Sequence, residues 1–222
     1  MPKLCAALAS RHSYGPDASQ FGDLYKGGDR GVAVLIHGGF WRDRYDLTLM
    51  EPLAEDLAAR GWTAWNIEYR RLGSGGGVPA TLDDVGAAID HLASLGLDGG
   101  RVVAIGHSAG GHLAAWAAAR DDARVPLTGV VSQAGVLDTR RAYELRLSKG
   151  VAEHFLGASP IQYAPLPIPA LLVHGSRDDI VPVELSEAFA AKGGAELAVF
   201  DEDHFGHLDP ENPMWKAVVE WL

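Results

Sequence analysis

The sequence predicts one α/β domain over residues 1–222, built on a mostly parallel, doubly wound sheet with helices on both faces. Short apolar runs rich in Val, Ile and Trp alternate with longer segments of helical period, which is the pattern of strand–helix units. Most of these runs are continuously apolar, as expected for strands that helices cover on both sides. With 222 residues, 47% of them apolar, the chain can bury a full core without disulfides or structural metal.

Six strands follow from these apolar runs. Each run is six or seven residues long, which is typical of a strand. The predicted strands cover residues 32–38, 63–69, 101–107, 127–133, 170–175 and 196–201.

Helices are predicted between the strands. Apolar side chains recur at helical spacing in residues 49–58 and 82–92, and further helices are expected at 109–120 and 212–222. Residues 136–169 break the rhythm, because they are polar, charged and then rich in proline. We expect a short cap-like insertion there instead of a large lid, beyond the carboxyl ends of the strands where open parallel sheets bind ligands.

Composition excludes several classes of function. Nineteen basic and 29 acidic residues give a formal charge of −10, which argues against a nucleic-acid partner. No apolar run reaches the 18 or so residues of a membrane span, and the run at residues 4–10 is shorter than a secretory core region. The single cysteine, Cys5, excludes an internal disulfide and a cysteine-rich zinc site. We therefore expect a cytoplasmic protein with no membrane partner.

A G-x-S-x-G pattern occupies residues 106–110, between a predicted strand and an alanine-rich helix. The pattern alone is weak evidence, but a serine on so sharp a turn needs a strained backbone, and neighbouring main chain leaves room only for glycine on either side. The helix that follows points free N–H groups at the serine and favours a developing negative charge. This placement indicates Ser108 as a nucleophile; the alternative is a glycine-rich turn with an incidental serine.

Serine at its free pKa is a poor nucleophile and needs a base and an orienting acid. The loop after strand 170–175 offers Asp178 and Asp179, and the loop after strand 196–201 offers His204 and His207. We favour Asp178, because Asp179 can serve as a helix-start or surface carboxylate. We favour His204, because it comes sooner after its strand. The chain order Ser, Asp, His is that of the α/β-hydrolase triad.

The first predicted strand ends in the segment HGGFW at residues 37–41. Its glycines allow main-chain N–H groups to approach a substrate oxygen closely. We expect the N–H groups of Gly39 and Ala109 as the oxyanion donors, with that of Phe40 as a further candidate. Phe40 and Trp41 would wall the substrate pocket; the alternative for both is packing.

Taken together, these motifs resemble the α/β-hydrolase superfamily, on the branch that includes kynurenine formamidase (arylformamidase) and small carboxylesterases. The resemblance implies the α/β-hydrolase fold, with Ser108 as nucleophile, Asp178 as orienting acid, His204 as base, and Gly38, Gly39 and Ala109 around the oxyanion. The matching segments run in family order: residues 14–25, HGGFW at 37–41, EYRR at 68–71, GHSAGGHLA at 106–114, HGSRDDIVPV at 174–183 and DHFGHLDP at 203–210.

The predicted reaction is two-step acyl transfer to water from a small ester or aryl formamide, through an acyl-enzyme on Ser108. No cofactor or metal is expected, because no histidine spacing resembles a metal-binding helix motif. A general short-chain carboxylesterase, a peptidase or an acyltransferase would use the same triad with a different pocket. A non-catalytic binding protein on this fold usually lacks one of the three reacting residues, whereas all three are present here.

Overall fold

A computed structural model describes residues 9–222 of the chain. Cys5 and most of the apolar run at residues 4–10 lie outside the described residues. The described part contains an eight-stranded sheet, formed by β1 (Ser10–Ser13), β2 (Phe21–Tyr25), β3 (Val32–Ile36), β4 (Thr63–Ile67), β5 (Val102–His107), β6 (Gly129–Gln133), β7 (Ala170–Gly175) and β8 (Ala195–Phe200).

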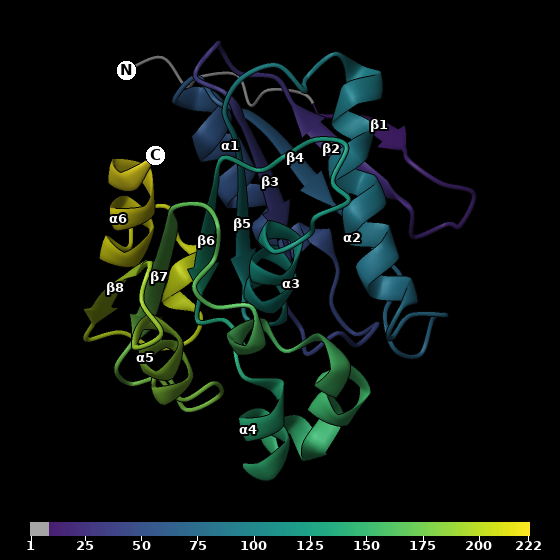
Figure 1. The fold of residues 1–222 in the computed structure, drawn as a ribbon. Helices are drawn as coiled ribbons and strands as arrows, with labels where there is room; N and C mark the ends of the chain where they lie inside the picture. Colours follow the sequence, from purple (N-terminus) through teal and green to yellow (C-terminus); the bar gives the residue numbers. More distant parts are fainter. Residues whose placement is uncertain (1–8) are drawn as a thin grey trace.

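The sheet has the order β1-β2-β4-β3-β5-β6-β7-β8 (Figure 1). β1 and β2 run antiparallel to their neighbours, and all pairs from β4 through β8 are parallel. The six predicted strands are all present, so the predicted mostly parallel sheet is confirmed. Because β3, β5, β7 and β8 run in one direction, the loops that carry HGGFW, the serine turn, the aspartates and the histidines leave the same edge of the sheet.

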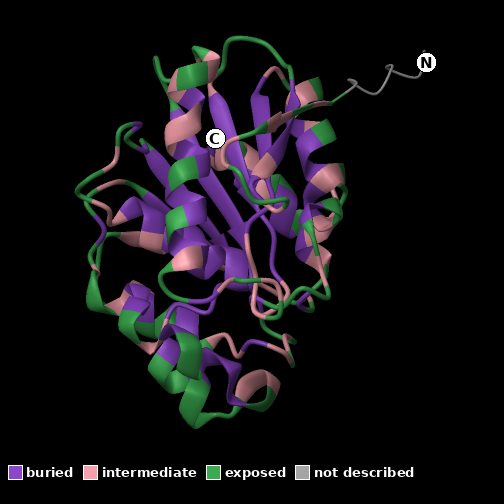
Figure 2. Ribbon diagram, turned by 90° about the vertical axis from the view of Figure 1, so that its right-hand side faces the viewer, coloured by how far each residue is buried: buried purple, intermediate pink, exposed green. Residues whose placement is uncertain are grey.

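Helices cover the sheet on both faces, as predicted. Alternate side chains of β3 show the two layers: Ala33 and Leu35 pack in a core with one set of helices, and Val34 and Ile36 pack in a second core with the other. Figure 2 shows the strands as a buried layer between the helices. α1 (Glu51–Ala59) and α6 (Pro213–Trp221) join the first core, and α2 (Ala80–Asp90), α3 (Ala109–Ala118) and α5 (Glu184–Ala190) the second.

The insertion predicted at residues 136–169 lies between β6 and β7, below the sheet in Figure 1. It contains α4 (Thr139–Glu144) and the 3₁₀ segments η3 (Leu147–Ala158) and η4 (Pro160–Gln162). The backbone of η3 turns left-handed at Ser148, Lys149 and Gly150, with φ of 45°, 63° and 77°. This turn directs the middle of the insertion back toward the carboxyl ends of the strands.

Several short elements were not among the predicted ones. β1 reads SRHS and is an edge strand with half-exposed or exposed side chains, so it lacks an apolar signal. α5 has seven residues and is too brief to show a helical period clearly. Within residues 9–222, no helix is long and apolar enough to cross a membrane. The remaining short 3₁₀ turns are η1 (Leu47–Met50), η2 (His91–Leu95) and η5 (Gly206–Leu208).

Candidate active site

Ser108 stands on a sharp turn between β5 and α3. Its φ of 56° and ψ of −118° form a strained conformation that a non-glycine residue rarely adopts. A Cβ on Gly106 would lie 2.0 Å from the Gly110 carbonyl oxygen, and one on Gly110 would lie 2.0 Å from that of Ile36. Both glycines are therefore required by space, and the turn fixes Ser108 at the amino end of α3.

His204 and Asp178 form a close pair next to this turn. The distance between His204 Nδ1 and Asp178 Oδ2 is 2.6 Å, and both side chains are almost fully buried. With the Nδ1 proton donated to the carboxylate, Nε2 of His204 is left with a lone pair that can accept a proton. The orientation of the imidazole is thus fixed by the acid.

Asp178 receives further donors around its carboxylate. The N–H groups of Ile180 and Val181 donate to Oδ1 at 2.9 and 2.8 Å, and His174 Nε2 lies 3.3 Å from Oδ2. Burial by itself would raise the pKa of the Asp178 carboxyl, but the hydrogen bonds from His174 and His204 outweigh it and hold that pKa well below its usual range. Asp178 is therefore an ionised acid at neutral pH.

The structure separates the neighbouring candidates. The Asp179 side chain is exposed and has no hydrogen-bond or ion-pair partner among the described residues, so it does not join the pair. His207 is buried in η5, and its ring lies 5.7 Å from that of His107 rather than against Asp178. His174, at the end of β7 beside the Asp178 loop, was not among the predicted site residues, although the sequence places it four residues before Asp178.

His107 links the serine turn to the His204 loop. Its Nε2 donates to the His204 carbonyl oxygen at 2.9 Å, and the two rings are 4.7 Å apart. Burial lowers the pKa of His107 to about 3, so this ring is neutral. Among the described residues no hydrogen bond joins the Ser108 hydroxyl to His204, although both side chains line one cavity.

The expected oxyanion donors lie beside Ser108. A Cβ on Gly38 would lie 2.9 Å from Ser108 Cβ, which shows how closely the HGGFW segment approaches Ser108. Gly39 has φ of 107°, and Ala109 is the first residue of α3. Neither the Gly39 N–H nor the Ala109 N–H has a hydrogen-bond acceptor in residues 9–222. These free donors fit an oxyanion site.

Phe40 and Trp41 have different surroundings. Phe40 lines the cavity in front of Ser108, as expected. Trp41 does not, and its expected role as a pocket wall is wrong: the side chain is 0% exposed, stacks on Phe155 of the insertion at 4.3 Å between ring centroids, and donates from Nε1 to His112 Nδ1 at 3.3 Å. The structure therefore places Trp41 in the core that attaches the insertion.

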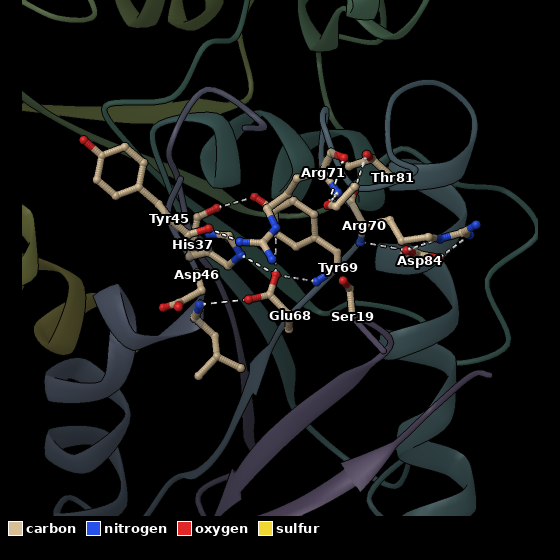
Figure 3. A network of polar contacts seen from close by, with 12 residues as sticks. Ser19, His37, Tyr45, Asp46, Glu68, Tyr69, Arg70, Arg71, Thr81 and Asp84 are labelled. Carbon is tan, nitrogen blue, oxygen red and sulfur yellow. Dashed lines mark hydrogen bonds and ion pairs between the residues drawn. The ribbon is translucent and has the colours of Figure 1, made fainter. Parts of the chain in front are cut away.

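A buried polar network holds the HGGFW segment in place (Figure 3). Glu68, at the end of β4, contacts His37 Nε2 at 3.0 Å, accepts from the Leu47 N–H at 3.2 Å and pairs with Arg71 at 3.2 Å. The Tyr69 hydroxyl donates to the His37 carbonyl at 2.8 Å. Residues of the sequence motif EYRR thus hold the HGGFW segment in position, a role that the motif alone did not predict.

A cavity of about 220 Å³ opens in front of Ser108 and His204. Its wall is mainly apolar and includes Phe40 and Phe205, and Arg42 and Arg44 reach it from the loop after Trp41. A small ligand in this cavity would lie next to both Ser108 and His204. The full lining is Gly39, Phe40, Arg42, Arg44, Tyr45, Leu49, His107, Ser108, Ser148, Ile180, His204 and Phe205.

Two family models match the chain. The BD-FAE model matches residues 24–140, and the Serine hydrolase model matches residues 90–219, each more than half of the chain. Together with the sheet topology and the solved structures below, these matches establish the α/β-hydrolase fold.

Curated relatives and solved structures are esterases. Esterase LipC of Mycobacterium tuberculosis is 28% identical over 94% of this chain and 61% of its own length, and esterase LipQ of the same organism is 31% identical over 84% and 52%. The chain thus spans about half to three fifths of these relatives. Esterase 2 of Thermogutta terrifontis, in a structure phosphoramylated by tabun, is 26% identical with a TM-score of 0.75, covering 98% of this chain and 93% of that one.

Proposed function

The chain belongs to the BD-FAE and Serine hydrolase families, and on this premise we propose that it is a carboxylesterase that cleaves small esters through an acyl-enzyme. The observation that carries the proposal is that two of the three side chains line one cavity and the third holds one of them. Ser108 stands on a strained turn, and His204, oriented by Asp178, lines the same cavity. The esterase names of the relatives and the reaction of the Thermogutta enzyme with organophosphates support this assignment.

In the proposed reaction the Ser108 hydroxyl attacks the ester carbonyl while His204 Nε2 takes its proton. Asp178 stabilises the imidazolium that forms, and the N–H groups of Gly39 and Ala109 bind the oxyanion. His204 then gives the proton to the departing alcohol as the carbon–oxygen bond breaks. Water attacks the acyl-enzyme in the same way, which releases the acid and restores Ser108. These residues supply every proton transfer, so the step needs neither metal nor cofactor.

We expect a short acyl group. The cavity measures about 220 Å³, and Phe40, Ile180 and Phe205 bound it. Each methylene that fits an apolar pocket gains up to about 0.8 kcal/mol, whereas a chain too long for this volume gains no further apolar burial. An aryl leaving group can lie along Phe40 and Phe205.

A series of phenyl esters from acetyl to octanoyl tests the proposal. We expect kcat/KM to fall steeply beyond about butyryl, and Ser108→Ala to remove hydrolysis of every member. A maximum at octanoyl would contradict the small pocket, and retention of more than a tenth of the activity by Ser108→Ala would contradict the nucleophile.

Formamide cleavage stays a prediction of the sequence resemblance, because the relatives named above are esterases. The same serine, acid and base would carry it, with an amine in place of the departing alcohol. N-formylkynurenine belongs in the same panel for this reason. Efficient cleavage would support the arylformamidase branch, and ester hydrolysis without it would leave a short-chain carboxylesterase.

A further inference from the structure

Two arginines at the mouth of the catalytic cavity have no assigned role. Arg42 and Arg44 follow the oxyanion segment directly and line the cavity together with Ser108 and His204. Both side chains are exposed, and neither forms an ion pair with a carboxylate in residues 9–222. The cavity lining contains no Asp or Glu. In a chain with a formal charge of −10, this is a local excess of positive charge at the place where substrate enters.

The position of Arg42 is set by the insertion. Its guanidinium donates to the Ser148 carbonyl oxygen at 3.0 Å, and its backbone forms a bridge with Leu72. Ser148 and Lys149 both have a left-handed backbone, a conformation that costs free energy for residues other than glycine. The strained turn thus presents a carbonyl to Arg42 and leaves other guanidinium N–H groups of Arg42 free to bind a ligand.

A second, more open groove of about 700 Å³ continues from the catalytic cavity. The two share Arg42, Arg44 and Ser148, and the groove adds Lys149. Two carboxylates also line this groove. Asp43 lies against Gly73, where a Cβ would be 2.5 Å from its Oδ2, and Glu153 lies 3.7 Å from His154 Nε2. The two arginines therefore lie at the boundary between the groove and the catalytic cavity. The lining on the side of Ser108 contains these arginines and no carboxylate.

We propose that Arg42 and Arg44 bind an anionic group, best a carboxylate, on the ester substrate, so that the preferred substrate is an ester with a charged end. The proposal rests on the esterase function proposed above. The apolar cavity receives the uncharged part with the scissile carbonyl, and the charged end reaches the boundary with the groove. A planar carboxylate matches the fixed fork of guanidinium donors.

Two pairs of esters test this. In the first pair the charge is on the leaving group: 4-acetoxybenzoate and its methyl ester. In the second it is on the acyl group: phenyl hydrogen adipate and its methyl ester. The quantity measured is the ratio of kcat/KM between the charged and the neutral member. Intrinsic reactivity cancels when this ratio is compared between variants, and the pair that responds identifies the charged side of the substrate.

Arg42→Gln and Arg44→Gln should each lower this ratio roughly three- to tenfold in at least one pair, and the double variant by more. Arg30→Gln is the matched control, because it removes the same charge from an exposed arginine next to Trp62, at the opposite end of β3. It should leave both ratios within about twofold. Added salt of 0.5 M should lower the wild-type ratio and have little effect on that of the double variant.

The outcomes are separable. If the neutral esters are hydrolysed but the double variant keeps the wild-type ratio in both pairs, the anion site is wrong and the esterase function stands. If neither member of either pair is hydrolysed, the esterase function fails, and calorimetric binding of 4-hydroxybenzoate against 4-hydroxybenzamide decides the anion site. Tighter binding of the benzoate that is lost in the double variant would support the site; equal binding of the two would overturn it.

Discussion

At the scale of single residues, the site depends on how donors surround Asp178. Its carboxylate accepts from two main-chain N–H groups and from His204, with His174 at 3.3 Å, whereas Asp179, the next residue, points to solvent. Such charge-assisted bonds keep the carboxylate ionised and fix its position. The two adjacent aspartates therefore differ in their surroundings in the folded protein. The sequence alone, which has the same residue type at both positions, does not show this difference.

Exchange of each aspartate for asparagine tests this difference. Asp178→Asn should lower kcat about 10³-fold or more, because an amide N–H facing His204 Nδ1 favours the wrong tautomer of the base. Asp179→Asn, the matched control, should change kcat by less than about threefold. Steady-state hydrolysis of phenyl acetate measures both, and a larger loss for Asp179→Asn would move the acid by one residue.

Trp41 shows the limit of sequence reasoning at this scale. The motif HGGFW correctly predicted a segment that approaches Ser108, because its glycines are needed for that approach. It could not tell which of the two aromatic residues faces the cavity. The left-handed backbone at both Phe40 and Trp41, φ of 50° and 57°, turns one ring to the cavity and the other to Phe155. That conformation depends on a contact with the insertion, more than 100 residues away.

At the scale of elements, the neighbouring strands β3 and β4 together position the HGGFW segment. β3 and β4 are parallel with Ile36 opposite Ile67, so the residues that follow, His37 and Glu68, emerge side by side. Glu68 then holds His37, the Leu47 N–H and Arg71 (Figure 3). The carboxylate acts as a positioning residue for the HGGFW segment, since it touches that segment and not the cavity.

Glu68→Gln should therefore lower kcat about tenfold with a smaller change in KM, because misplaced oxyanion donors affect the transition state most. It should also lower the free energy of unfolding by about 2–4 kcal/mol, since Arg71 loses its buried partner. Asp23→Asn is the control: Asp23 pairs with Arg11 between β1 and β2, away from the site. It should reduce stability without lowering kcat. Equal kcat in Glu68→Gln and wild type would contradict the positioning role.

At the scale of the whole molecule, the pattern of apolar residues predicted the strands of the parallel sheet. For the insertion it predicted the position in the chain but not the conformation. A continuous apolar run such as residues 32–36 can bury all its side chains only as a strand between two helix layers. Residues 136–169 have no such period, and their conformation is set by contacts with the rest of the molecule, such as Phe155 on Trp41. Three histidines are buried at contacts of this kind: His107 and His207 lie beside the His204 loop, and His112 of α3 contacts the Ala158 carbonyl of the insertion.

These histidines predict an acid-sensitive fold. Burial lowers the pKa of His107 to about 3 and of His112 to about 4, and lowers that of His207 well below its usual value. An unfolded histidine titrates near 6.5, so between about pH 6.5 and 4 the unfolded chain binds protons that the folded chain does not. As the pH decreases through this window, the free energy of unfolding should fall by roughly 1 kcal/mol per pH unit for each histidine.

Urea unfolding followed by tryptophan fluorescence at pH 7.5, 6 and 5 measures this dependence. His112→Gln keeps an amide that can donate to the Ala158 carbonyl. It should reduce the slope of the unfolding free energy against pH by the contribution of one histidine. His154→Gln, at an exposed position, should leave the slope unchanged. Stability that does not vary over this range would contradict the account of three neutral buried rings.

The central claim is that the strained serine of β5–α3 is the nucleophile of one hydrolytic site. Labelling with a fluorophosphonate, followed by intact-mass and peptide analysis, tests it most directly. We expect one covalent adduct per chain, on Ser108, with simultaneous loss of phenyl acetate hydrolysis and no adduct in Ser108→Ala. An adduct on another residue, or labelling of Ser108→Ala at the wild-type rate, would contradict it.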